Sequence, residues 1–245
     1  MELRIVGSSS KGNGYLLEAE NGDQLLIEAG CHLREYQDVG RLKRSRACGM
    51  IVSHEHGDHC KYVREFTSAG IDVYSTAAVK ENNKFGVTAV EHGKTYQVGD
   101  FRVTPLKVEH DVECFAYLVH HPEIKTLMFA TDCWNLHQVV KGVSHYLIEA
   151  NYQDDILDEA VRTGKTIPSM ADRVRLSHMS LKHCVEYLKM CDAGKTAKTI
   201  TLIHASDRHL DKKHAELTVA GQTGVPTCCL LYTSPSPRDM RRSRM

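Results

Sequence analysis

Short apolar runs recur along the chain, and their lengths and borders predict strands. Each run has four to eight residues, and many are bounded by Gly, Asp or Pro. The segment Asn21-Gly22-Asp23 separates two of these runs and predicts a tight hairpin turn. The ten expected strands are Leu3–Val6, Tyr15–Glu18, Gln24–Glu28, Gly49–Ser53, Asp72–Ser75, Phe101–Val108, Cys114–His120, Thr126–Ala130, Tyr146–Glu149 and Thr199–His204.

Helical spacing of apolar residues predicts five helices among these strands. Strands dominate the first half of the chain, and helices punctuate the second half. This order favours an α/β fold with two sheets and outer helices over a doubly wound sheet. Residues 1–229 contain no internal repeat or low-complexity linker, so we expect a single domain there. The expected helices are Lys61–Ser68, Ala77–Asn83, Asp155–Arg162, Leu181–Met190 and Leu210–Val219.

The last segment, residues 230–245, shows neither the alternation of a strand nor the apolar spacing of a helix. Its sequence, LLYTSPSPRDMRRSRM, contains two of the six Pro residues of the chain, four Arg and one Asp. Such a composition is typical of a disordered basic tail. The segment also resembles translated adapter sequence. We therefore interpret residues 230–245 as a disordered or non-native tail and assign them no function.

Composition narrows the class of protein. The 245 residues carry 31 Lys and Arg against 31 Asp and Glu, which excludes a broadly basic nucleic-acid coat. The nine Cys form no Cys-x-x-Cys pair, so neither a disulfide framework nor a thiolate zinc site is expected. Scattered unpaired Cys indicate a cytoplasmic location. The apolar runs are too short for a signal peptide or a membrane span, so we expect no membrane partner.

The 15 His residues point to metal or acid–base chemistry. One segment, His54-Glu55-His56-Gly57-Asp58-His59, places four potential metal ligands within six residues directly after an expected strand. In an extended chain, residues i and i+2 point the same way, and a following helical turn brings residues i+4 and i+5 round. The segment therefore predicts a site for two adjacent metal ions.

Three further candidate ligands each follow an apolar strand. His110 follows the run Phe101–Glu109, Asp132 follows Leu127–Thr131, and His204 follows Thr199–Ile203. Taken alone, a His after a strand is more often structural. Together with the histidine segment, these strand ends predict one shared site at a sheet edge.

In these motifs the sequence resembles the metallo-β-lactamase-fold hydrolases. The match covers residues 1 to about 222 and comprises the Glu28-Ala29-Gly30 turn, the His-x-His-x-Asp-His segment and the three later ligands. The resemblance implies a metallo-β-lactamase-type αβ/βα four-layer sandwich. It also implies two divalent metal ions, for which an all-nitrogen and oxygen ligand set suits Zn2+, with Mn2+ or Fe2+ as alternatives. By the family pattern, one ion takes His54, His56 and His110, the other takes Asp58, His59 and His204, and Asp132 bridges both.

One position departs from the family pattern, because Glu28 stands where an Asp is usual. We expect its longer carboxylate to orient a metal-bound His. The bridging Asp132 resembles the phosphodiesterase, nuclease and thioesterase branches of the family more than the true β-lactamases.

Three loops resemble the small bacterial WalJ-like exonuclease and phosphodiesterase group. They are the Gly-Ser-rich loop 7–14, the segment 147–151 and the segment 177–180. The resemblance implies that Ser10 and Asn13 border the active site. It also implies that His178 lies near the metals without binding them, where it protonates the leaving oxygen or holds the phosphate. In the alternative, His178 is the last metal ligand, and His204 lies behind the ligands without binding a metal.

These residues predict a dinuclear metal-dependent hydrolase, foremost a phosphodiesterase or exonuclease. A hydroxide between the metals would attack phosphorus, with Asp58 as a metal ligand that orients it and His178 at the leaving group. The expected partner is an anionic phosphodiester, with DNA and RNA both open, and the oligomeric state is open too. Two alternatives stand beside this one: a thioester hydrolase of the glyoxalase type, and a metal-stabilised binding module without turnover.

Overall fold

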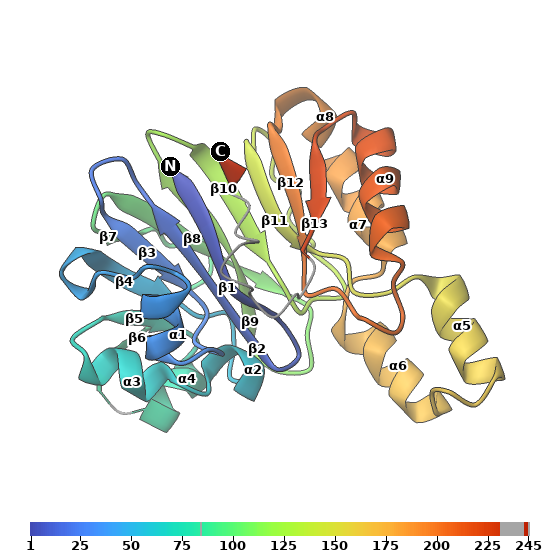
Figure 1. The fold of residues 1–245 in the computed structure, drawn as a ribbon, viewed down its shortest axis with the longest axis horizontal. Coiled ribbons are helices and arrows are strands. Elements are labelled where there is room, and N and C mark those ends of the chain that lie inside the picture. The colour runs from blue at the N-terminus through green and yellow to red at the C-terminus, as the bar shows by residue number, and fades with distance from the viewer. Residues whose placement is uncertain (84, 231–242, 245) are drawn as a thin grey trace. The chain divides into compact units, whose positions relative to one another are not determined.

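The structure is a computed structural model that describes residues 1–83, 85–230 and 243–244. Its chain contacts divide it into two compact units (Figure 1). The first unit contains Met1–Leu106, Tyr117–Lys125 and residues 243–244, and the second contains Lys107–Ala116 and residues 126–230. A single domain over residues 1–229 stays a prediction.

The first sheet lies wholly in the first unit and follows the order β14-β1-β2-β3-β4-β5-β6. Neighbours from β14 to β3 pair antiparallel, and those from β3 to β6 pair parallel. The parallel part places the carboxyl ends of β3 and β4 side by side. The strands are β1 (Glu2–Ser9), β2 (Gly12–Glu18), β3 (Gln24–Ile27), β4 (Ala47–Ile51), β5 (Val73–Ser75), β6 (Val87–Ala89) and β14 (Ser243–Arg244).

The second sheet has the order β13-β12-β11-β10-β9-β8-β7. Strands β10 to β13 are parallel, so the chain leaves β10, β11 and β12 at the same edge. The strands are β7 (Tyr96–Val98), β8 (Phe101–Val108), β9 (Cys114–His121), β10 (Lys125–Ala130), β11 (His145–Glu149), β12 (Thr199–Ile203) and β13 (Thr227–Cys229).

Helices of the first unit cover a buried face of its sheet. Strand residues Leu16 and Leu26 pack in one apolar cluster with Tyr36, Phe66 and Val79 from three different helices. The rings of Tyr36 and Phe66 meet edge to face, with centroids 5.2 Å apart. The cluster fixes the strand ends relative to the helices. The helices of this unit are α1 (Leu33–Asp38), α2 (Gly57–Cys60), α3 (Val63–Ser68) and α4 (Ala77–Asn83).

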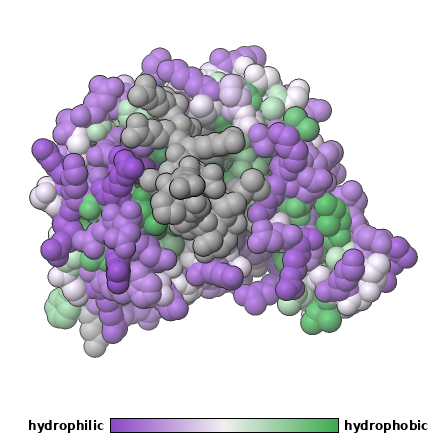
Figure 2. All heavy atoms as spheres, in the orientation of Figure 1, coloured by the Kyte–Doolittle hydropathy of each residue, from purple (hydrophilic) through white to green (hydrophobic). Residues whose placement is uncertain are grey.

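Helices of the second unit form two groups. Figure 1 shows α7 and α9 alongside β11 to β13, whereas α5 and α6 form a pair of their own. That pair packs around Leu157 and Ala171, and Figure 2 shows hydrophobic patches over it, where Ile167 directly before α6 and Met170 and Leu176 within it are exposed. The helices are α5 (Asp154–Arg162), α6 (Pro168–Ser177), α7 (Leu181–Met190), α8 (Ala193–Thr196) and α9 (Lys212–Thr223).

The sequence pattern located every expected strand and helix within a few residues. It missed the helices α1, α6 and α8 and the three-residue strands β6, β7 and β13, and it predicted α2 only as a helical turn after the histidine segment. Of the expected tail, Ser243–Arg244 pairs with β1, while 231–242 and 245 lie outside the described residues. None of the helices in the described ranges combines the length and the apolar character required to span a membrane.

His145 at the start of β11 gives a pH prediction. Its ring is buried, with Nδ1 2.8 Å from the Thr199 hydroxyl. Burial, and then the positive charge of Lys198, lowers the pKa of His145 to about 4. Between the ordinary pKa of about 6.5 and pH 4 the unfolded chain therefore binds a proton that the folded chain excludes. Stability should fall as the pH falls through this window, by up to about 3 kcal/mol from this group.

The test is the free energy of unfolding at pH 6.5 and pH 4.5 in the presence of a chelator. His145→Gln keeps a hydrogen-bonding side chain but does not titrate there, so it should lose less stability than the wild type. His183→Gln, at an exposed position of α7, is the matched control. Equal pH dependence in all three proteins would contradict the assignment.

Candidate functional site

The histidine segment bridges the end of β4 and the short helix α2, as the spacing predicted. His54 lies in the loop, and His56 is the residue before the first turn of α2, which carries Asp58 and His59. The His54 ring lies 4.7 Å from the His56 ring and 4.4 Å from the His59 ring, measured between centroids. His54 Nδ1 lies 2.8 Å from the Ser53 hydroxyl, which fixes the orientation of the ring.

Glu28 follows β3 and is completely buried behind this segment. Its Oε1 accepts a hydrogen bond of 3.2 Å from the Ser53 amide, and its Oε2 lies 3.3 Å from His59 Nδ1. The Tyr36 hydroxyl lies 2.6 Å from the Glu28 carbonyl oxygen and anchors the backbone there. Glu28 is thus placed where a carboxylate can orient the His59 ring and leave Nε2 on the other side.

The close packing of neighbouring backbone around Gly30 explains why this turn contains a glycine. A Cβ atom at Gly30 would lie 1.7 Å from the Asp58 carbonyl oxygen and 2.5 Å from the Asn13 amide nitrogen. The backbone of α2 therefore approaches so closely that no side chain fits. We expect Gly30→Ala to displace α2 and lower the free energy of unfolding by about 1–3 kcal/mol.

Gly57 is the matched control for this prediction, because a Cβ atom there would meet no atom within 4 Å. Gly57→Ala should change the free energy of unfolding by less than about 1 kcal/mol. Chemical denaturation of both variants without metal is the measurement. Equal stability of the two variants would show that the close approach at Gly30 does not constrain the fold.

Asn13 and Ser10 differ in their surroundings. Asn13 is buried, and its Nδ2 lies 3.3 Å from the Asp58 carbonyl oxygen, 3.4 Å from Asp58 Oδ2 and 3.2 Å from His59 Nε2. Ser10 lies exposed in the turn between β1 and β2, and no hydrogen bond of its side chain occurs among the described residues. Of the two loop residues, Asn13 is the one that contacts candidate ligands.

In the second unit, three parallel strands deliver acidic and histidine side chains to one edge. Asp132 follows β10, Glu149 ends β11 and His204 follows β12. His204 Nδ1 lies 2.8 Å from Asp132 Oδ1 and 2.9 Å from Glu149 Oε1. Together with His178, these residues offer ligand atoms within 4.8 Å of one another.

Glu149 is the residue that the sequence argument did not assign. It is completely buried, and its carboxylate lies 2.8 Å from His178 Nδ1 while accepting hydrogen bonds from the Cys133 and Met179 amides. Burial raises the pKa of Glu149, but the charge and hydrogen bond of His178, then the hydrogen bond of His204, outweigh it and lower the pKa. The sequence contains one signal that could have identified Glu149: it is an acidic residue at the end of an otherwise apolar strand.

His178 follows the last residue of α6, and its side chain is more accessible than that of His204. Its side chain is 22% exposed, against 4% for His204, and its Nδ1 lies 3.8 Å from Asp132 Oδ1. Burial lowers its pKa, yet the carboxylate of Glu149, with a smaller effect of Asp132, raises it above the ordinary value. His178 therefore carries its proton to a higher pH than a free histidine does.

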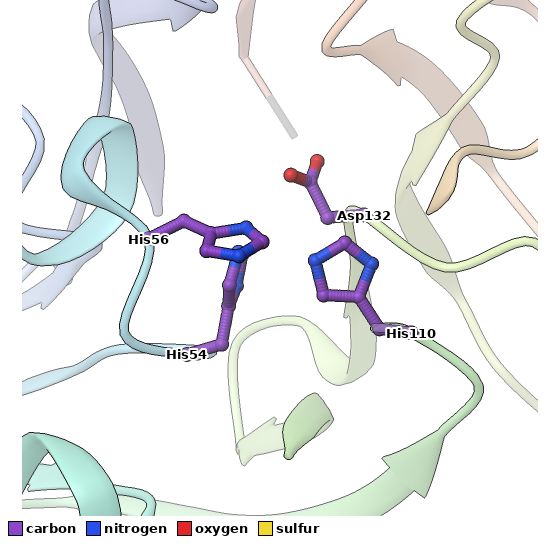
Figure 3. A group of neighbouring side chains, drawn as sticks. All are labelled: His54, His56, His110 and Asp132. Carbon is purple, nitrogen blue, oxygen red and sulfur yellow. The ribbon is translucent and has the colours of Figure 1, made fainter. Parts of the chain in front are cut away.

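His110 follows β8 and is tied to α6. Its Nδ1 lies 3.2 Å from the Ser177 carbonyl oxygen, and its Nε2 lies 3.0 Å from Asp111 Oδ1. A proton on Nδ1 donated to the Ser177 carbonyl would make Nε2 the nitrogen that could bind a metal ion. Figure 3 shows His110 and Asp132 of the second unit, and His54 and His56 from the loop that precedes α2 in the first unit.

Backbone strain marks three of these positions. Six residues other than Gly have positive φ in the described chain, and among them are Glu28 at 67°, Asp132 at 47° and His204 at 51°. Each follows a strand and carries a candidate functional side chain. Left-handed conformations of this kind cluster at functional sites, where the surrounding structure maintains them.

The order and spacing of these motifs agree with a known protein family. The profile of the family described as "Beta-lactamase superfamily domain" matches residues 24–205, which is most of the chain. The chain belongs to this family. The two mixed sheets with their helices agree with this membership, so the predicted metallo-β-lactamase-type α/β fold is confirmed.

Relatives within the superfamily support the resemblance to the WalJ-like group. Exodeoxyribonuclease YycJ of Bacillus anthracis is 24% identical over 177 residues, which cover 64% of this chain. The match spans 65% of that relative, which is less than two thirds of its length.

Solved structures of the superfamily share the fold along most of the chain. The metallo-β-lactamase fold protein YhfI of Bacillus subtilis aligns with a TM-score of 0.73 at 16% identity, covering 94% of this chain and 95% of that one. The short form of human tRNase Z aligns with a TM-score of 0.64 at 13% identity, covering 94% and 96%.

The donor atoms at these strand ends fit divalent metal ions. They are imidazole nitrogens and carboxylate oxygens, the set that zinc, manganese and iron accept in proteins. The site contains no thiolate donor among them, and burial of Cys133 raises its thiol pKa. Asp132, Glu149, His178 and His204 are also close enough to hold one ion, since their ligand atoms lie within 4.8 Å of one another.

Proposed function

We propose that this chain is a dinuclear metal-dependent phosphodiesterase that acts on nucleic acid as an exonuclease. The observation that carries the proposal is a carboxylate-supported histidine group at the strand ends of each unit: His59 beside Glu28 in the first unit, and His178 and His204 beside Glu149 in the second. The relationship to an exodeoxyribonuclease supports the substrate class.

The ligands follow the order of the family motifs. By that order, His54, His56 and His110 would hold one ion, Asp58, His59 and His204 would hold the other, and Asp132 would serve both. The donor set suits Zn2+. When bound, two divalent ions supply Lewis acidity for the attack of water on phosphorus and offset the charge that develops on the phosphoryl oxygens.

His178 serves the leaving group in this proposal. Its Nδ1 faces Glu149 at 2.8 Å, which leaves Nε2 to donate a proton to the leaving oxygen. Its raised pKa keeps that proton bound to a higher pH than in a free histidine. The distances favour His204 over His178 as the last ligand, because His204 lies 2.8 Å from Asp132 whereas His178 lies 3.8 Å away.

Asp58 and the residues around it orient the nucleophile. The Asn13 amide contacts both the carbonyl oxygen and Oδ2 of Asp58, so the carboxylate has a defined direction. Glu28 holds His59 from the opposite side of the ring at 3.3 Å. The chain thus contributes ligands whose rotamers are constrained by buried polar neighbours.

Metal analysis coupled to a substrate panel tests the proposed function. The panel contains single- and double-stranded DNA, RNA, bis-p-nitrophenyl phosphate and a set of thioesters. We expect about two ions per chain and turnover of phosphodiesters, with turnover lost in Asp58→Asn while the fold is retained. Thioester turnover alone would support a glyoxalase-type hydrolase. Metal binding with no turnover in wild type or variant would support a binding module.

A further inference from the structure

Trp134 is the only tryptophan of the chain, and it is 37% exposed two residues after Asp132. Tryptophan is among the most buried residue types on average, so this exposure calls for an explanation. Covalent geometry keeps the Cα atoms of residues i and i+2 within about 7–8 Å. Trp134 therefore stands at the border of the strand edge where Asp132 lies.

Trp134 is exposed on a constrained loop. Its neighbours Cys133 and Leu136 are buried, and a backbone bridge ties the loop to Glu109. The Trp134 amide donates to the Glu109 carbonyl oxygen at 3.2 Å, and the Glu109 amide donates to the Asn135 carbonyl oxygen at 3.2 Å. Glu109 directly precedes His110, so the loop is fixed beside two assigned ligands.

The charges around Trp134 select what can bind there. Glu109 and Asp111 lie on the adjoining segment; the Glu109 carboxylate lies 2.9 Å from His137 Nε2, and the Asp111 side chain is 44% exposed. Carboxylates repel a phosphate but not a neutral aromatic ring, so the backbone of a nucleic acid is disfavoured on this flank. An uncharged base that stacks on the indole is compatible with both neighbours.

We infer that Trp134 is a stacking platform for a nucleobase of the substrate, adjacent to the phosphodiester held by the site. This inference rests on the proposed phosphodiesterase function. It specifies that the substrate has an unpaired base beside the phosphate to be cleaved. Stacking is tolerant of base identity because every base has a π face. Trp134 thus favours single-stranded ends without selecting a sequence.

Fluorescence gives a direct test, because the signal reports on Trp134 alone. Metal-loaded protein is titrated with a phosphorothioate oligothymidylate, which resists cleavage, and with an abasic phosphorothioate strand of equal length. We expect oligothymidylate to quench the emission and to bind about tenfold more tightly than the abasic strand. Equal quenching by both strands, or quenching by neither, would overturn the inference.

Kinetics on the corresponding phosphodiester strands provide the second readout. Trp134→Leu should raise KM for oligothymidylate about tenfold, leave KM for the abasic strand unchanged and keep the dependence on salt. Trp134→Phe should recover most of the loss. The control is Leu217→Ala, which removes an exposed apolar side chain of α9.

The two proposals fail in different ways. Unchanged kinetics in Trp134→Leu would overturn the stacking role while the phosphodiesterase function stands. Absence of cleavage by the wild type would contradict the phosphodiesterase function, and the stacking role would then be decided by the fluorescence titration alone.

Discussion

Asp132→Asn should lower kcat/KM for phosphodiesters about 10^3-fold or more and reduce the bound metal below two ions per chain. The proposed function gives this carboxylate to both ions, so its loss weakens both. Asn is the suitable replacement because Asp132 has φ of 47°, and Asn tolerates this left-handed conformation well. The measurement is steady-state kinetics together with metal analysis of the purified variant.

The stability of the metal-free variant separates a functional role from a structural one. Asp132 and Glu149 are carboxylates that share the same histidine nitrogen, and the charge of Asp132 raises the pKa of Glu149. Removing one negative charge should leave the unfolding temperature of the metal-free chain unchanged or higher. A metal-free variant that unfolds, or one that keeps full activity, would contradict the assigned role.

Asp192→Asn is the matched control for this experiment. Asp192 also has a positive φ, 55°, but it lies before α8 and pairs with Lys141 and Lys195 on the surface. The same chemical change at the same backbone conformation should therefore leave activity and metal content unchanged. Any effect on stability should remain within about 1 kcal/mol, because surface ion pairs contribute little.

The sequence predicted the elements whose physics is local. Strands such as β8 and β10 are apolar runs with polar borders, and the turn into α2 follows from the spacing of His54, His56 and His59. The strands β6 and β7 have only three residues each, too few for a period to be visible. Helix α6 was missed because few apolar positions of its sequence face the core, while its residues Met170 and Leu176 are exposed.

The candidate site was predicted as a set of donors but not as an arrangement. Strand ends and residue types identified Asp132 and His204, whereas the role of Glu149 depends on contacts to His178 and His204 that lie 29 and 55 positions away. The left-handed backbone conformation of Glu28 cannot be predicted from the sequence either, since nothing local favours it in a residue other than Gly. Tertiary contacts impose both features.

His178→Gln should lower kcat on DNA or RNA strands by a factor of about 10^2 to 10^4, because the leaving oxygen would lose its proton donor. The effect on bis-p-nitrophenyl phosphate should be less than about tenfold, since a nitrophenolate leaves without protonation. In the wild type, turnover of strands should fall as the pH rises through the raised pKa of His178, where the donor proton is lost. The variant should lack that decline.

Metal content decides between the two roles open to His178. If His178 donates the proton, His178→Gln keeps two ions per chain and Glu149→Gln partly reproduces its loss on strands, because Glu149 holds the ring at 2.8 Å. If His178 were the last ligand, the variant would lose metal and would fail equally on strands and on the nitrophenyl ester. His183→Gln on the exposed face of α7 controls for the substitution itself and should match the wild type on both substrates.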